Sequence, residues 1–413
     1  MNRLSKSRSS SVFLLIAGLS GLAFLGAGTD PAEVENHAFA LAQKVLILDS
    51  HMDVPYRLMT RMVDISQRTF TTDFDYPRAR EGGLDVAFLA VFTPQSMEAS
   101  GGARAHALRQ IALVEGLAER WPDAFALARS PGEIRSKSQR GRILFPMGME
   151  NGIPLEGDVR NVRFFHERGI RYITLVHSKD NSLADASFDT THTWGGLSPF
   201  GREVIMEMNR VGIMVDVSHM SDSAFTQTIR ISGAPVIASH SACRAFTPGF
   251  ERNMSDEMIR LLAAHGGVIQ INFGSMFLVD SLRGQMAKAG GAVREYLRER
   301  NLHYLDEEAM TYTRNLRKQL GIPYADVRDV ALHIDHVVKL VGSDHVGFGS
   351  DFDGVGDDLP TGLKDVSGYP NILRELLLLG YSEGEIEKIC SGNFLRVWDE
   401  VERVARAIER PDR

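Results

Sequence analysis

The chain has 413 residues, of which 46 are Lys or Arg and 53 are Asp or Glu, so its formal net charge is −7. Hydrophobic residues make up 44% and charged residues 24%, which is typical of a soluble globular protein and excludes a disordered or polytopic membrane chain. The acidic balance and the lack of a basic block argue against nucleic acid as a partner. The only cysteines, Cys243 and Cys390, allow at most one disulfide and exclude a Cys-rich zinc module.

The first 28 residues differ from the rest of the sequence. Arg3, Lys6 and Arg8 precede an uncharged apolar run at residues 12–25, which small residues follow. This pattern predicts a signal peptide at residues 1–28 and one exported domain at residues 29–413. The run is short for a spanning helix, which needs about 20 apolar residues, yet an uncleaved N-terminal membrane anchor is the alternative. We therefore expect a periplasmic or extracellular protein.

From residue 45 onward, short apolar runs alternate with amphipathic stretches such as 105–120 and 202–211. The runs predict strands buried on both faces, and their alternation with helices predicts a parallel sheet. Eight such units predict an α/β protein, a (β/α)8 TIM-like barrel with loop and helical insertions, while an open doubly wound sheet is the alternative. One insertion, charged and helix-like, is expected at residues 280–330. The predicted strands are Val45–Leu48, Val86–Phe92, Ile143–Met147, Tyr172–Val176, Ile213–Val217, Val236–Ala238, Val268–Ile271 and Val346–Phe348.

His or carboxylate residues follow six of these eight runs. Because barrel strands end on one face, where the active site lies, we expect these side chains to meet at one mouth. Each residue alone has an ordinary structural explanation, such as a surface turn for the His-x-Asp pair, but six placements together favour a site. Three imidazoles and two carboxylates of this set suit a two-zinc centre with N and O ligands. The residues are His51 and Asp53, Glu150, His177, His219, His240 and Asp351.

The motifs around these residues resemble the membrane dipeptidase (renal dipeptidase) family of zinc peptidases. The resemblance covers roughly residues 40–400, with the motifs in order, and is far more specific than any single motif. It implies a (β/α)8 barrel with two zinc ions that hydrolyses dipeptides. The motifs are LDSHMD (48–53), GMENG (148–152), TLVHSKDNSLAD (174–185), GLSPFGREV (196–204), DVSHMS (216–221), SHSACRAF (239–246), ERNMSDEMI (251–259), GFGSDFDG (347–354) and GNFLRV (392–397).

The resemblance assigns the metal ligands residue by residue. It implies that His51 and Asp53 bind one Zn²⁺, that His219 and His240 bind the other, and that Glu150 bridges them. Related metal-dependent hydrolases often use a carbamylated Lys as the bridge, but no Lys ends the fourth run here. The family resemblance also implies a homodimer.

The same resemblance names the groups that act on the substrate. His177 matches a non-ligand His that contacts the substrate and stabilises the oxyanion, Arg252 the Arg that binds the substrate carboxylate, and Asp351 the proton-transferring carboxylate. Phe277 stands where mammalian members have a substrate-contacting Tyr, so one polar contact is missing and side-chain preference is in doubt. A hydroxide that bridges the metals would attack the scissile amide.

Two other functions are weighed against dipeptide hydrolysis. The first is a metal-dependent amidohydrolase that acts on another small amide or lactam. The second is an exported binding or scaffold protein with an inactive barrel, which should lack at least one ligand, and none is missing here. A metal analysis and a dipeptide panel would separate the three.

Overall fold

The computed structural model describes residues 30–138 and 141–409, so the predicted signal peptide or anchor lies outside the described residues. Within these, ten strands form one parallel sheet. They are β1 (Ile47–Met52), β2 (Leu84–Phe92), β3 (Phe125–Leu127), β4 (Ile143–Phe145), β5 (Met147–Glu150), β6 (Ile170–Thr174), β7 (Met214–Asp216), β8 (Ile237–Ser241), β9 (Val268–Ile271) and β10 (Val346–Phe348).

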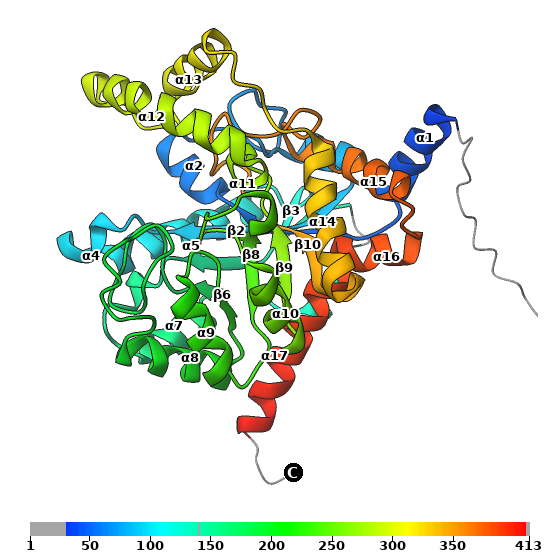
Figure 1. Ribbon diagram of the computed structural model, residues 1–413. Coiled ribbons are helices and arrows are strands. Elements are labelled where there is room, and N and C mark those ends of the chain that lie inside the picture. Colours follow the sequence, from blue (N-terminus) through cyan, green and yellow to red (C-terminus); the bar gives the residue numbers. More distant parts are fainter. Residues whose placement is uncertain (1–29, 139–140, 410–413) are drawn as a thin grey trace, which may run out of the picture.

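Eight of the strands close into a barrel, which confirms the predicted (β/α)8 fold (Figure 1). Their order around the barrel is β1, β10, β9, β8, β7, β6, β5 and β2. β1 pairs with β2 on one side and with β10 on the other, where Asp49 is in register with Phe348. Each predicted strand lies in this barrel with its ends shifted by at most four residues, and the open-sheet alternative is wrong.

The third predicted strand is divided. Pro146 separates β4 from β5, because proline has no backbone N–H to donate to the ladder. β2 nevertheless pairs with both pieces, so they continue one barrel strand. The short strand β3 pairs only with β4 outside the barrel, and the apolar runs do not predict it.

Helices surround the barrel, and their ends follow from capping residues. In α8, which extends the predicted 202–211 helix, the Ser198 side chain accepts from the Gly201 N–H and Gly212 ends the helix at φ 85°. The α-helices are α1 (Pro31–Ala42), α2 (Val54–Thr60), α3 (Tyr76–Gly82), α4 (Ser96–Ser100), α5 (Ala103–Arg120), α6 (Pro131–Lys137), α7 (Arg160–Glu167), α8 (Pro199–Val211), α9 (Asp222–Ile231), α10 (Asp256–Ala264), α11 (Ser275–Leu278), α12 (Asp280–Arg300), α13 (Glu307–Gln319), α14 (Val327–Val341), α15 (Tyr369–Leu378), α16 (Glu383–Glu387) and α17 (Asn393–Glu409). Single turns lie at η2 (Ile153–Leu155), η3 (Arg244–Phe246), η4 (Ser343–His345), η5 (Val366–Gly368) and η6 (Lys388–Gly392).

The last helix, α17, packs against the starts of the barrel strands. Its Trp398 lies 5.3 Å from Phe88, ring centre to ring centre, and Phe88 lies 5.6 Å from Tyr172 inside the barrel. Both helix and strand residues belong to one buried cluster. One end of the barrel is therefore filled by apolar side chains, and only the carboxyl ends of the strands are left for chemistry.

The predicted helical insertion is confirmed as the pair α12 and α13, which projects from the barrel at the upper left of Figure 1. Only Leu282 and Ala289 of α12 are buried. None of the helices in the described residues is long and apolar enough to span a membrane. Cys243 and Cys390 are both buried free thiols.

Candidate metal centre and substrate pocket

The five predicted metal ligands meet at the carboxyl ends of the strands. His51 lies within β1 and Asp53 is the residue before α2, while Glu150 is the last residue of β5. His219 follows β7 by three residues and His240 lies within β8. All five side chains are buried. The barrel thus brings together residues that span nearly 190 positions of the chain.

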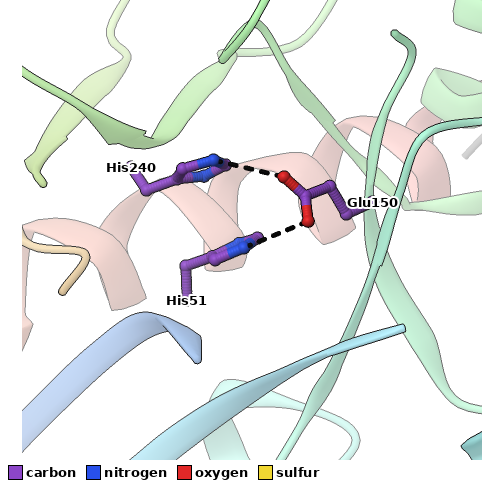
Figure 2. Close-up of side chains that lie close together, drawn as sticks. All are labelled: His51, Glu150 and His240. Atoms are coloured by element: carbon purple, nitrogen blue, oxygen red, sulfur yellow. Dashed lines mark ion pairs between the residues drawn. The ribbon is translucent and has the colours of Figure 1, made fainter. Parts of the chain in front are cut away.

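Glu150 is at the centre of the cluster. Its Oε1 lies 3.2 Å from His219 Nε2 and 3.3 Å from His240 Nε2, and its Oε2 lies 3.5 Å from His51 Nε2. Figure 2 shows the carboxylate pointing between His51 and His240, one oxygen toward each ring. The second carboxylate, Asp53, has its Oδ2 3.7 Å from His51 Nε2. Glu150 can therefore reach two positions at once.

The charges of the cluster fit bound cations. Burial and then Arg252 lower the pKa of His219 well below its usual range, and burial and then His51 do the same for His240. Burial alone would raise the pKa of Glu150, but His51 and the other imidazoles hold it well below the ordinary value. The site therefore offers two neutral imidazoles, His219 and His240, and an ionised carboxylate, whereas for His51 the lowering effect of burial is outweighed by Tyr172 and Glu150, which raise its pKa well above the usual range.

Buried atoms without hydrogen-bond partners and the spacing of the donor atoms also indicate a metal site. His51 Nε2 and Asp53 Oδ1 are buried without a hydrogen-bond partner among the described residues. Three triads have donor atoms close enough to share an ion, and two of them contain Glu150. Nitrogen and carboxylate donors are the ligands that zinc takes in catalytic sites. The residues present fit a pair of zinc ions. The triads are His51, Glu150 and His240; Glu150, His177 and His219; and His51, Asp53 and Asp351.

Neighbouring hydroxyls orient the imidazoles. The Tyr172 hydroxyl lies 2.8 Å from His51 Nδ1, and the Ser239 hydroxyl lies 2.8 Å from His240 Nδ1 while it donates to Asp216. Each contact leaves Nε2 to face Glu150. A Cβ on Gly148 would lie 1.9 Å from the Tyr172 ring, so glycine is required for this packing. Sequence reasoning missed these supporting residues and treated Tyr172 as an apolar strand residue.

Arg252 lies beside the imidazoles and is 3% exposed. Its guanidinium donates to the His240 carbonyl at 2.7 Å and to the Ser241 hydroxyl at 3.0 Å, and it lies 5.4 Å from the centre of the Phe277 ring. Burial lowers its pKa to about 10, so it stays charged at neutral pH. In the part of the chain that the structure describes, no carboxylate forms an ion pair with it.

Asp351 and His177 also lie next to the cluster of predicted metal ligands. Asn272 donates to Asp351 Oδ2 at 2.8 Å, and burial together with Asp53 raises the pKa of Asp351 to about 7. His177 Nε2 lies 3.6 Å from Glu150 Oε1, and burial lowers its pKa. The structure thus places a carboxyl group that titrates near neutrality and a neutral imidazole at the cluster.

These groups line a pocket of about 280 Å³, a volume that suits a molecule the size of a dipeptide. Apolar side chains complete its wall, and Phe277 is among them, at the place that the resemblance implied for a substrate-contacting residue. The lining residues are Asp53, Phe92, Glu150, His177, Phe188, His219, Arg252, Met276, Phe277, Tyr304, Asp351, Gly354 and Val355.

A (β/α)8 barrel with His and carboxylate donors at its mouth is typical of metal-dependent hydrolases. Residues 35–412 match the family model of membrane dipeptidase, peptidase family M19. The chain belongs to this family and is a dipeptidase of the metallopeptidase class.

Curated relatives agree with the family match. Dipeptidase 3 of Mus musculus is 30% identical over 387 residues, which cover 91% of this chain and 68% of that protein. An uncharacterised dipeptidase of Schizosaccharomyces pombe is 30% identical over 418 residues, or 97% of this chain and 92% of that protein.

Solved structures share the fold. A probable dipeptidase, PvdM, from Pseudomonas aeruginosa has a TM-score of 0.75 and 29% identity, with 91% of this chain and all of that chain covered. A metallopeptidase from Rhodobacter sphaeroides, liganded with a phosphinate mimic of L-Ala-D-Ala, has a TM-score of 0.71 and 25% identity, with 86% and 99% covered.

Proposed function

We propose that this chain hydrolyses dipeptides at a centre of two Zn²⁺ ions. The position of Glu150 supports this most strongly, since one carboxylate oxygen faces His219 and His240 and the other faces His51. His51 and Asp53 would hold one ion, His219 and His240 the other, and Glu150 would bridge them. When bound, the ions supply a water-derived nucleophile at neutral pH and polarise the amide carbonyl.

Arg252 fixes the substrate in this proposal. Its buried guanidinium, without a carboxylate partner in the described residues, suits the free C-terminal carboxylate of a dipeptide. Because that carboxylate lies only one residue beyond the scissile bond, the pocket would exclude longer peptides. This length limit distinguishes a dipeptidase from an endopeptidase.

In this proposal Asp351 transfers the proton, and His177 stabilises the negative charge that develops on the substrate oxygen. A carboxyl group with a pKa of about 7 can take the proton of the attacking water and return it to the leaving amine. The neutral imidazole of His177 can donate to the oxygen that becomes negative in the transition state. No further titratable group is needed for the reaction.

Metal analysis and a substrate panel test the proposal. The purified protein should contain two zinc ions per chain and should hydrolyse L-Ala-D-Ala and L,L-dipeptides faster than N-acyl amino acids or lactams. Preference for the latter compounds would favour the alternative amidohydrolase. His177→Asn should retain both ions, because we propose His177 as a substrate contact; loss of one ion would make it a ligand.

Export and assembly are separate proposals. The basic and apolar pattern of residues 1–28 supports export to the periplasm or outside the cell, by a cleaved signal peptide or an N-terminal anchor. The family resemblance supports a homodimer. N-terminal sequencing of the exported protein and light scattering test the two proposals.

A further inference from the structure

The loop between α12 and α13 reaches back to the substrate pocket, although most of this helix pair projects away from the barrel (Figure 1). Tyr304 lies in this loop and lines the pocket together with Asp53 and Asp351. Its side chain is 43% exposed, and its hydroxyl has no hydrogen-bond partner among the described residues. A phenol at the rim is therefore free to contact a bound molecule.

Helix α2 holds this loop in place. Arg57 donates to the carbonyl of Leu305, and the Tyr56 hydroxyl lies 3.3 Å from His303 Nε2. Leu305 is 1% exposed, so the loop is anchored by a buried side chain as well. Because α2 begins directly after Asp53, the loop is fixed relative to the metal cluster.

The two ends of the pocket differ in charge. Arg252 contacts His219, His240 and Ser241, which lie on or beside β7 and β8. Tyr304 lines the same pocket as the carboxylates of Asp53 and Asp351, which follow β1 and β10. Burial and then these carboxylates raise the pKa of Tyr304, so its hydroxyl is protonated and neutral at physiological pH. A zwitterion with its carboxylate at Arg252 would direct its ammonium group toward Tyr304.

We propose that Tyr304 is a substrate-contacting residue whose hydroxyl oxygen accepts a hydrogen bond from the free ammonium group of the substrate. The helical insertion then selects dipeptides with an unblocked amino terminus. This inference rests on the proposed dipeptidase function and adds a residue that determines specificity at the amino-terminal end.

The substitution Tyr304→Phe tests the inference, because it removes the hydroxyl and keeps the ring. Tyr312→Phe is the matched control, since Tyr312 stacks on Tyr296 at 3.6 Å in the same helix pair, outside the pocket lining. KM and kcat are measured for L-Ala-D-Ala and for N-acetyl-L-Ala-D-Ala. Calorimetry measures the affinity for a phosphinate analogue of the free dipeptide, which is not turned over.

We expect Tyr304→Phe to raise KM for the free dipeptide and to weaken the phosphinate roughly 10-fold or more, as for a hydrogen bond to a charged group. The preference for the free over the acetylated dipeptide should fall by the same factor, while kcat changes little. Values equal to those of Tyr312→Phe would overturn the inference. If the wild type cleaves no dipeptide, the proposed function itself fails, and the two failures are thus distinct.

Discussion

The Nε2 atoms of His219 and His240 lie 2.8 Å apart, and each also faces Oε1 of Glu150. Two neutral imidazoles and one carboxylate oxygen cannot all satisfy one another, because an imidazole nitrogen without hydrogen is an acceptor. A cation among the three resolves the conflict. We therefore expect that metal binding at the proposed ligands would relieve this conflict.

Removal of metal should destabilise the protein. We expect a chelator to abolish hydrolysis and to lower the free energy of unfolding by roughly 3 kcal/mol for each zinc ion removed, relative to free zinc at 100 times its Kd. Added Zn²⁺ should restore both, whereas Mg²⁺ should not, because it prefers oxygen ligands. Thermal unfolding with and without each ion measures this. An unchanged melting temperature after complete zinc removal would contradict it.

Tyr172→Phe should weaken zinc binding without unfolding the barrel. The substitution removes the hydroxyl that lies 2.8 Å from His51 Nδ1, and loss of such an orienting contact typically lowers metal affinity 10- to 100-fold. Competition with a chromogenic chelator measures the affinity. Tyr381→Phe is the control, because its hydroxyl contacts Asp335 instead. Equal affinities of the two variants would show that Tyr172 only packs.

Asp351→Asn should retain both zinc ions and lose most turnover. Proton transfer contributes typically 10²–10⁴-fold to rate, and the amide cannot accept a proton. Asn272 would remain as a hydrogen-bond neighbour, so the pocket should keep its shape. Elemental analysis and kcat measure the two effects. Loss of a zinc ion would instead identify Asp351 as a ligand, which its place in one donor triad allows.

Arg252→Ala should remove the preference for a free C-terminal carboxylate. In the wild type we expect dipeptide amides to be poor substrates. A charge-assisted contact of about 1.5–3 kcal/mol corresponds to roughly 10- to 150-fold in kcat/KM. Comparison of a dipeptide with its amide in both proteins measures this. Zinc content serves as a control, because Arg252 also contacts His219. A preference that survives the substitution would exclude this role.

Asp85 provides a pH-dependent test of stability outside the site. Burial raises its pKa to about 6, although the Ile47 N–H and Arg80 oppose the shift. A raised carboxyl pKa favours folding below the unfolded pKa near 4, and this contribution is lost as pH rises through 6. Asp85→Asn should therefore gain stability relative to wild type between pH 4 and 7, on the order of 1–3 kcal/mol. A difference in unfolding free energy that does not vary with pH would contradict this.

The barrel and its cluster were predictable because local patterns encode them. Strands buried on both faces appear as apolar runs, and a polar residue such as Glu150, three positions after the end of its run, can be recognised from the sequence alone. Pro146 interrupts its run without ending the strand, and β3 is too short to produce a pattern.

The contacts that support the cluster were not predictable in this way. Tyr172 reaches His51 across the barrel interior, over a distance set by the closure of eight strands. Tyr304 lies in a charged insertion whose sequence shows only an exposed helix pair, and its place at the pocket depends on the bond from Arg57 to Leu305. Such contacts join elements that are far apart in the chain, and the periodicity of apolar residues gives no information about them.

The closure of the barrel between β1 and β10 also sets the order in which the chain can mature. Ser50, the neighbour of His51, donates to the carbonyl of Phe348, 298 positions later. One edge of β1 therefore stays unpaired during synthesis until nearly the whole chain has been made. An unpaired strand edge can form hydrogen bonds with other chains. The five proposed ligands all precede residue 241, but Asp351, the proposed proton carrier, follows β10, so a chain stopped before β10 should be able to bind zinc without turning over substrate.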